Sequence, residues 1–320
     1  MESVDYIFGR IYEALHKAER VLLIAHRKPD GDTLGASSST HRWLKSLNKD
    51  VTLFCQDSPS DKHIYLEHYG DFTDDPGVFD RPYDVVVVFD SGTLRYAGVH
   101  EHILRLPAGY QLINIDHHIV NDRYGDINFV LPEATSTSEI MYRFFEANGI
   151  VIDAAIATAL LTGIFFDTSN LTNSATTPKS IEISGRLMAS GARYQEIVRH
   201  TLHDKSVDLL RIWGIMLSRL RYNTRFDIVT TYLLNDDFDD VSTEAIEGAS
   251  NFLNAVTGDG DTILTLKETP QGMIKGSFRS YKRDVSKIAR LLGGGGHKKA
   301  AGFAIPGRIQ ETIDGPVIVK

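Results

Sequence analysis

Apolar and polar residues alternate along the first half of the chain in a way that predicts strands separated by helices. Short β-branched runs predict strands at 21–25, 51–54, 83–89, 111–115 and 127–130. The last of these is predicted to lie at the edge of the sheet. Apolar residues at helical spacing predict helices at 4–19, 33–47 and 140–148, and the almost uncharged run 154–166 predicts a buried helix. This order predicts an α/β fold with a mainly parallel sheet flanked by helices.

The pattern changes in the second half. Three successive helices are predicted first: 178–189, 194–203 and 206–222. Short strands and two further helices follow: strands at 228–234, 262–266 and 272–278, helices around 244–256 and 284–292. We therefore predict a first domain over 1–190, a helical linker over 191–224 and a smaller α+β domain over 225–320.

Metal-ligand side chains follow the predicted strands where each strand ends. The first strand runs into His26, Asp30 and Asp32, and the valine-rich third strand ends at Asp90. The next strand ends in three potential ligands, Asp116, His117 and His118, and Asp167 directly follows the apolar helix 154–166. Ligands of open α/β sheets bind at the carboxyl ends of the strands, so these groups predict a metal site there.

Each of these segments also has a purely structural interpretation. The polar turn after His26 could be a strand-to-helix loop in which Asp30 and Thr33 cap the helix. Residues 135–139 resemble a helix N-cap, which we favour over phosphate binding. His41 is expected to be a partly exposed surface residue, and His200 and His203 lack an acidic neighbour that would complete a metal site.

Cysteine content restricts the metal chemistry. Of 320 residues, 42% are hydrophobic and only Cys55 carries a thiol, which excludes a disulfide framework and a thiolate cluster. A metal must be held by His, Asp and Glu, and such ligands suit Mn²⁺ or Mg²⁺, with the histidines favouring Mn²⁺. We find no signal peptide and no apolar run long enough to span a membrane, so we expect a cytoplasmic protein.

Positive charge is concentrated in one stretch of an acidic chain. The formal net charge is −8, yet residues 267–300 contain nine Lys or Arg residues against only Glu268 and Asp284. Within this stretch four glycines, 293–296, precede His297 and two lysines. Open backbone N–H groups beside cationic side chains are suited to binding an anion, although a flexible loop is the structural alternative. A polyanionic partner is therefore compatible with this sequence.

Five ordered motifs resemble those of the DHH phosphoesterase superfamily. Four are His26-x-x-Pro29-Asp30-x-Asp32, Asp90 after a valine run, Asp116-His117-His118, and Gly163-Ile164-x-x-Asp167-Thr168. The fifth, GGGGHKKAAGF, resembles the signature of the type 1 DHH-associated domain. In length and layout the chain is similar to stand-alone bacterial oligoribonucleases, or nanoRNases. Some of these also dephosphorylate 3′-phosphoadenosine 5′-phosphate (pAp) or cleave linear dinucleotides such as pApA.

The resemblance implies roles for individual residues. Two Mn²⁺ or Mg²⁺ ions are implied, held by His26, Asp30 and Asp90, and by Asp32, Asp90, His117 and Asp167. Asp116 would orient a histidine ligand of the metal and His118 would reach the scissile phosphate, so the implied catalytic set is Asp90, Asp116 and His118. Substrate binding is implied for His118 and for residues of the second domain: Arg279, Ser280, Gly294, Gly295, Gly296 and His297.

One departure from the family pattern and several alternative functions remain. Ser169 and Asn170 stand where the family often has glycine, which leaves the shape of that loop open. The resemblance favours short RNA or DNA oligonucleotides, or dinucleotides, as substrates, and it implies a homodimer. The alternatives are a RecJ-like single-strand exonuclease, which would normally need an extra binding domain, a family II pyrophosphatase, and a non-catalytic nucleotide-binding protein.

Overall fold

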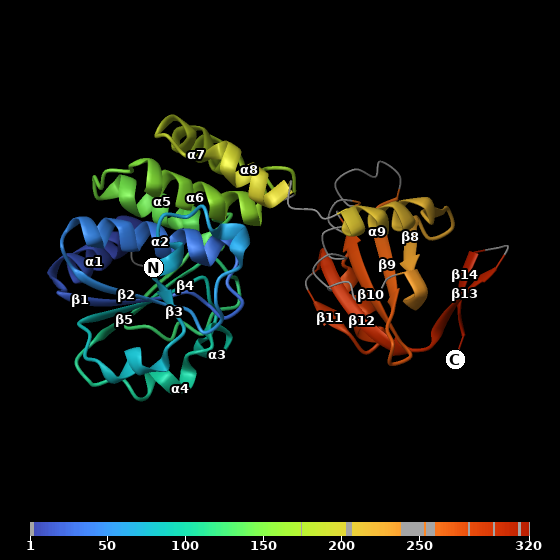
Figure 1. Cartoon of the computed structure of the whole chain (residues 1–320), viewed down its shortest axis with the longest axis horizontal. Coiled ribbons are helices and arrows are strands. Elements are labelled where there is room, and N and C mark those ends of the chain that lie inside the picture. Colours follow the sequence, from blue (N-terminus) through green and yellow to red (C-terminus); the bar gives the residue numbers. More distant parts are fainter. Residues whose placement is uncertain are drawn as a thin grey trace. The chain divides into compact units, whose positions relative to one another are not determined.

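The computed structural model describes residues 3–173, 175–202, 207–237, 253, 260–280, 282–296, 298–312 and 315–319. The chain divides into two compact units, Met1–Asp204 and Lys205–Lys320, which are described separately (Figure 1). The helices of the predicted linker belong to different units. Helix α8 (Tyr194–Leu202) contacts α6 (Ala154–Asp167) of the first unit, whereas α9 (Val207–Ser218) contacts strand β8 (Ile228–Leu233) of the second.

A six-stranded parallel sheet forms the centre of the first unit and confirms the predicted fold class. Its strands are β1 (Arg20–Ile24), β2 (Asp50–Phe54), β3 (Phe72–Thr73), β4 (Val85–Phe89), β5 (Gln111–Asp116) and β6 (Ile127–Val130). They are arranged in the order β3-β2-β1-β4-β5-β6. The strand order reverses between β1 and β4, and the carboxyl ends of strands at such a switch point form the usual binding crevice.

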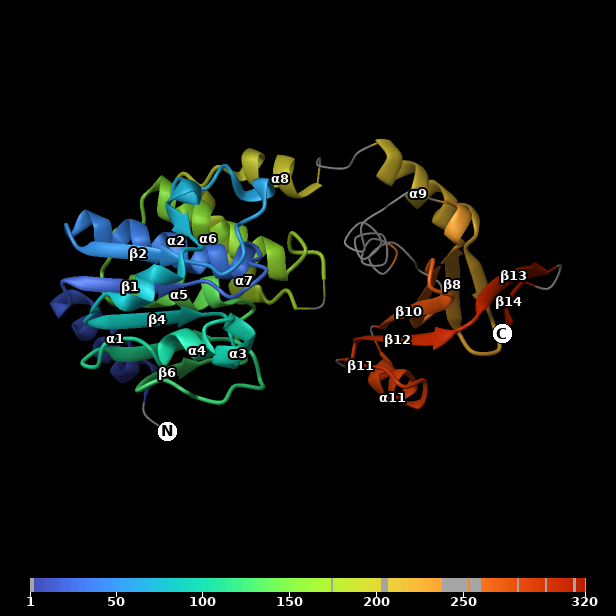
Figure 2. The same cartoon turned by 60° about the horizontal axis from the view of Figure 1, so that its bottom comes forward.

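Helices cover both faces of this sheet (Figures 1 and 2). One face carries α1 (Val4–Lys17), α2 (Gly31–Ser46), α5 (Thr137–Ala147) and α6, with α7 (Pro178–Ala189) packed on α5 and α6. The other carries the short helices α3 (Leu94–Ala97) and α4 (His100–Ile103). Three 3₁₀ turns lie between β2 and β4: η1 (Asp61–His63), η2 (Tyr69–Asp71) and η3 (Pro76–Asp80).

Side-chain alternation along the strands builds two separate cores. Val21 and Leu23 of β1 join the core under α2, α5 and α6, whereas Leu22 and Ile24 join the core under α3 and α4. All four are fully buried, and each contributes about 1.5–3 kcal/mol of transfer free energy. Burial on both faces explains why these strands have uninterrupted apolar sequences.

The second unit is a smaller domain built on a mixed sheet. Its sheet has the order β11-β12-β10-β9-β8-β7, in which β8 and β9 are parallel and the other neighbouring strands are antiparallel. The elements not yet given are β7 (Arg221–Asn223), η4 (Asn235–Asp237), β9 (Thr262–Glu268), β10 (Met273–Ser280), α11 (Val285–Leu291), β11 (Gly295–Gly296), β12 (Ala300–Pro306), β13 (Arg308–Thr312) and β14 (Gly315–Val319).

Three details of the second unit differ from the prediction. The helix predicted over 206–222 ends at Ser218, and residues 221–223 pair with β8 as an edge strand. Part of the predicted glycine loop is β11, which pairs with β12, and the strands after residue 300 were not predicted. The helix predicted around 244–256 lies almost entirely outside the described residues, as do His203 and His297.

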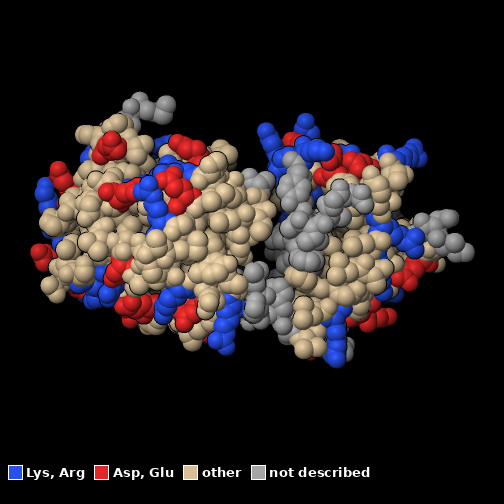
Figure 3. Space-filling model, turned by 90° about the horizontal axis from the view of Figure 1, so that it is seen from above, with Lys and Arg blue, Asp and Glu red and all other residues tan. Residues whose placement is uncertain are grey.

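Charged side chains of both signs are interspersed over the visible face of the first unit (Figure 3). Such a surface does not form a single-sign field on that face. Within the part of the chain that the structure describes, no helix has both the length and the apolar character needed to cross a bilayer.

Candidate metal centre

The carboxyl ends of β1 and β4 place His26 and Asp90 beside each other. His26 Nε2 lies 3.5 Å from Asp90 Oδ2, and both side chains are almost completely buried. Asp90 has a left-handed backbone (φ 56°), which an L-residue adopts only at a cost of about 1–2 kcal/mol. Its N–H extends the β4–β5 ladder by donating to the Ile115 carbonyl at 2.9 Å. The ladder therefore holds a strained residue whose carboxylate lies among imidazoles.

Asp30 combines the two interpretations that the sequence left open. It is the N-cap of α2, and its Oδ1 accepts the backbone N–H groups of Asp32 and Thr33 at 3.0 and 3.2 Å. Its other oxygen, Oδ2, lies 3.7 Å from His26 Nε2. One oxygen thus caps the helix while the second faces the candidate metal centre.

Asp32 is held by the start of a helix far away in sequence. Its carboxylate is fully buried and accepts the backbone N–H groups of Thr137 and Ser138 at 2.6 and 2.8 Å. These N–H groups belong to the first turn of α5, where the helix dipole favours a negative charge. The N-terminus of α5 therefore orients this carboxylate, and the His117 imidazole lies close enough to favour its charged form.

All six predicted metal ligands come together at this edge of the sheet. They form overlapping sets in which one ligand atom of each residue lies within 4.8 Å of the others: His26, Asp30 and Asp90; Asp90, His117 and His118; Asp32, His117 and Asp167. His117 Nε2 is 3.4 Å from Asp90 Oδ1 and 3.2 Å from Asp167 Oδ2. Asp90 thus presents one oxygen to His26 and the other to His117, as a carboxylate bridging two cations would.

The pKa values show a surplus of negative charge in this site. Burial, followed by the charge of Asp90, raises the pKa of Asp32 to about 7, and burial likewise raises the pKa of Asp167 far above its usual range. Burial alone would lower the pKa of His117, but its hydrogen bond to Asp90 and the nearby carboxylates raise it to about 10. Without cations, protonation of these side chains offsets the repulsion between neighbouring carboxylates. Divalent cations would neutralise the same negative charge, so the donor set fits metal ions.

Asp116 positions His118 rather than a predicted metal ligand. Its Oδ1 accepts His118 Nδ1 at 2.7 Å, and its Oδ2 accepts Asn121 Nδ2 at 2.7 Å. The His118 side chain is 44% exposed, compared with 18% for His117 and 3% for His26. His118 is therefore the imidazole of this centre that an incoming molecule reaches most easily. The sequence pattern carried no sign of Asn121.

Two other functional contacts were missed by the sequence analysis. The cap at 135–139 is present as predicted, because Ser136 Oγ accepts the Glu139 N–H at 3.0 Å. Thr137 Oγ1, however, also donates to Asp90 Oδ1 at 3.1 Å, and Ser138 Oγ to the Asp32 carbonyl at 3.2 Å. The only signal in the sequence was a run of hydroxyl residues longer than a cap requires.

The loop after Asp167 adopts an unusual backbone where the sequence departs from the family pattern. Ser169, Asn170 and Leu171 all have left-handed φ values of 50°, 60° and 64°. Such φ values favour glycine, which explains why glycine is common there in the family. The loop is held by the Asn170 N–H, which donates to the Phe165 carbonyl at 2.7 Å, and Asn173 Nδ2 donates to the Asp167 carbonyl at 2.8 Å.

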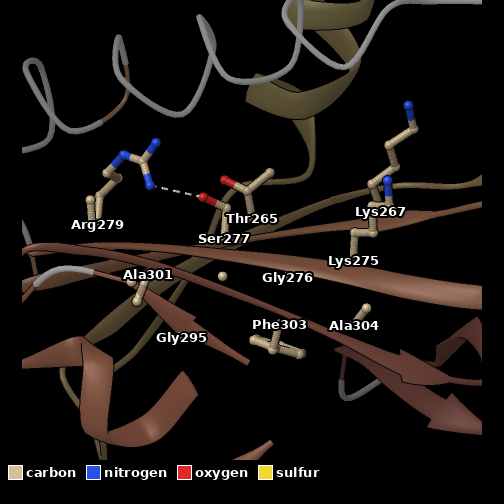
Figure 4. Close-up of a pocket in the computed structure, with 13 residues that line it drawn as sticks. Thr265, Lys267, Lys275, Gly276, Ser277, Arg279, Gly295, Ala301, Phe303 and Ala304 are labelled. Carbon is tan, nitrogen blue, oxygen red and sulfur yellow. Dashed lines mark hydrogen bonds between the residues drawn. The ribbon is translucent and has the colours of Figure 1, made fainter. Parts of the chain in front are cut away.

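A cationic pocket of about 570 Å³ lies on the sheet of the second unit (Figure 4). Lys275, Ser277 and Arg279 alternate along β10 and so point to the same side, and Lys267 of β9 lies directly opposite Lys275. Arg279 Nη1 donates to Ser277 Oγ at 3.0 Å. Burial, and then the charge of Lys275, lower the pKa of Lys267. Like charges opposite each other are unfavourable unless an anion lies between them.

The predicted substrate residues of this unit are only partly brought together. Gly295 and Gly296 line the pocket with Arg279. Ser280 does not, because strand alternation turns its side chain to the buried face, where its hydroxyl donates to the Asp261 carbonyl at 2.6 Å. Gly294 packs so closely on β12 that a Cβ would lie 2.0 Å from the Gly302 carbonyl oxygen. His297 lies outside the described residues.

A parallel sheet with clustered carboxylates and imidazoles at its switch point defines a class of α/β hydrolases that work with divalent metal ions. Comparison with known families narrows this class. The profile described as "DHH family, N-terminal domain" matches residues 20–164, and the DHHA1 domain profile matches residues 227–314. The chain therefore belongs to the DHH family of phosphoesterases, as its motifs indicated.

Relatives and a solved structure extend over almost the whole chain. The chain is 29% identical over 299 residues to the bifunctional oligoribonuclease and PAP phosphatase NrnA of Thermus thermophilus, covering 93% of this chain and 88% of the relative. It is 23% identical over 292 residues to the NrnA of Bacillus subtilis, covering 90% of each chain. The crystal structure of an exopolyphosphatase-related protein from Bacteroides fragilis matches with a TM-score of 0.83 at 23% identity, covering 93% and 90% of the two chains, which supports the fold.

Proposed function

We propose that this protein is a metal-dependent phosphodiesterase that hydrolyses short oligonucleotides or linear dinucleotides such as pApA, and that also dephosphorylates pAp. The observation that carries the proposal is the overlap of ligand sets at Asp90 and His117. A single metal would need only one set, whereas phosphoryl transfer commonly uses two adjacent cations. The names of the two NrnA relatives support the choice of substrate.

We assign the ligands as follows: His26, Asp30 and Asp90 would hold one ion, and Asp32, Asp90, His117 and Asp167 the other. When bound, these ions would lower the pKa of a water molecule and offset the charge of the phosphate. Oxygen and imidazole donors favour Mn²⁺ over Mg²⁺. Cys55 is no competing thiolate, because burial raises its pKa to about 12 and its thiol donates to the His26 carbonyl at 3.2 Å.

Within this proposal the chain's own residues bind and orient the substrate. Asp116 accepts the Nδ1–H of His118 and raises the pKa of this histidine, so the protonated ring can donate its other nitrogen, Nε2, to a phosphate oxygen. In the second unit Arg279 would bind another phosphate through its planar guanidinium, with Lys267 and Lys275 on the same face. Backbone groups of 294–296 and His297 would contact the terminal nucleotide.

The decisive experiment is a time course on 5′-labelled dinucleotides to pentanucleotides with Mn²⁺, Mg²⁺ or EDTA, using wild type and Asp90→Asn. We expect Asp90→Asn to abolish turnover and retain a native circular-dichroism spectrum, because one carboxylate serves both ions. Exposed Asp122 provides the matched control, and Asp122→Asn should keep wild-type rates. Wild-type hydrolysis by Asp90→Asn would refute the assignment.

Parallel reactions separate the alternative functions. A twenty-nucleotide single strand hydrolysed faster than pApA would favour a RecJ-like exonuclease, and pyrophosphate hydrolysis would favour a pyrophosphatase. Tight dinucleotide binding without any metal-dependent product would indicate a non-catalytic nucleotide-binding protein. We further propose that the enzyme acts in the cytoplasm and that it is a homodimer. Light scattering on the purified chain would test the oligomeric state.

A further inference from the structure

A second group of metal-ligand side chains lies on α2, at a distance from the centre described above. His41 of α2, and His68 and Asp71 at η2, each offer one ligand atom within 4.8 Å of the other two. His41 follows Asp32 by nine residues in the same helix, which corresponds to about 13 Å along the helix axis. The two groups therefore share no ligand and cannot share an ion.

His41 is the buried member of this group. The sequence pattern suggested a partly exposed surface residue, but the structure leaves only 3% of its side chain accessible. Its Nδ1 is buried, finds no hydrogen-bond partner among the described residues, and lies 4.0 Å from Asp71 Oδ2. A buried polar atom without a partner is costly, and such atoms in native proteins commonly indicate a missing ligand.

His68 faces His41 across the same space. The two rings lie edge to face with their centroids 4.4 Å apart, and His68 Nδ1 is 2.8 Å from Asp71 Oδ2. The other nitrogen of His68, Nε2, is also buried without a hydrogen-bond partner in the described part of the chain. Glu67 Oε1 lies 4.0 Å from that nitrogen, but it is paired with Arg42 Nη1 at 2.9 Å, so Asp71 is the carboxylate of this group. Two imidazoles with unpartnered nitrogens thus converge beside this carboxylate.

We propose that His41, His68 and Asp71 form a further metal site that binds Zn²⁺ and is distinct from the hydrolytic centre. Two imidazole nitrogens and one carboxylate oxygen are a common zinc donor set, with a fourth position left for water. The Asp71 side chain is 53% exposed, so an ion can enter and the carboxylate can move to bonding distance. The ion would fasten the segment between β2 and β3 to α2.

Zinc stoichiometry tests this proposal without any use of activity. Metal-free wild type and the double variant His68→Gln/Asp71→Asn are dialysed against Zn²⁺, and the bound zinc per chain is measured by mass spectrometry. We expect wild type to bind one more zinc per chain than the double variant. His16→Gln, which removes an exposed histidine outside the group, should keep the wild-type stoichiometry.

Two further measurements keep the result interpretable. Mn²⁺-dependent hydrolysis should be the same in the double variant and in wild type, which shows that the fold and the hydrolytic centre are intact. If the double variant does not fold, Asp71→Asn alone is used, and its zinc affinity should fall at least tenfold. Equal stoichiometry and equal affinity in wild type and variants would overturn the proposal and leave a hydrogen-bonded His–Asp pair.

Discussion

The approach of α6 to α2 offers a way to disturb the proposed metal centre without changing any of its proposed ligands. A Cβ added at Gly163 would lie 2.0 Å from Ser138 Oγ and 2.6 Å from Asp32 Oδ1. Ordinary carbon–oxygen contacts are about 3.4 Å, so the new methyl group of Gly163→Ala pushes the side chains of Asp32 and Ser138 away from α6 by roughly 1 Å. The chain has little room for this, because both side chains are fully buried.

The expected cost follows from the bonds that Asp32 would lose. Its carboxylate accepts two backbone N–H groups of α5, and each such bond to a charged group is worth about 1.5–3 kcal/mol. Small shifts of the surrounding side chains would preserve part of this hydrogen-bond free energy. We therefore expect Gly163→Ala to lower the free energy of unfolding by about 3 kcal/mol. Displacement of a ligand by about 1 Å should reduce kcat/KM on pApA about 100-fold.

The assay combines thermal unfolding with dinucleotide hydrolysis at saturating Mn²⁺. Gly185 of α7 is the matched control, because nothing lies within 4 Å of a Cβ at this helical glycine. Gly185→Ala should raise the free energy of unfolding by roughly 0.5–1 kcal/mol and leave turnover unchanged. The reasoning is refuted if Gly163→Ala keeps kcat/KM within twofold of wild type.

Three more predictions concern the centre and its surroundings. Asn121→Ala removes the hydrogen bonds to Asp116 and to the buried Asn114, and should lower kcat on pApA about tenfold and the free energy of unfolding by about 1–2 kcal/mol, measured by steady-state kinetics and scanning calorimetry. Ser169→Gly relieves a left-handed backbone and should raise the free energy of unfolding by up to about 1 kcal/mol in urea titrations; a loss of stability would contradict this. Mn²⁺ bound at the proposed ligands would displace protons from Asp32, with a pKa of about 7, and from His117, with a pKa of about 10. Apparent Mn²⁺ affinity should therefore rise about 1,000-fold from pH 6 to 8, about 100-fold from His117 and about tenfold from Asp32, and calorimetry that finds no proton release would exclude this linkage.

Much of the first unit is readable from sequence because its signals are local. Uninterrupted valine and isoleucine runs predict strands buried on both faces, and each ligand type directly follows such a run or an apolar helix. Parallel strands bring their carboxyl ends to one edge, so the sequence alone determined that His26, Asp90 and His117 would lie near one another.

Contacts between distant segments were decided only by the tertiary structure. Thr137 is 105 residues from Asp32, and nothing in either segment indicates that the N–H groups of one hold the carboxylate of the other. The direction and exposure of a side chain are likewise set by packing: strand alternation turns Ser280 away from Arg279, and His41 is buried where His68 packs against it. The sequence thus determined which chemical groups are available and on which elements, because propensity and periodicity act over a few residues. The folded chain determined their partners and exposure, because those depend on close packing between segments that are far apart in sequence.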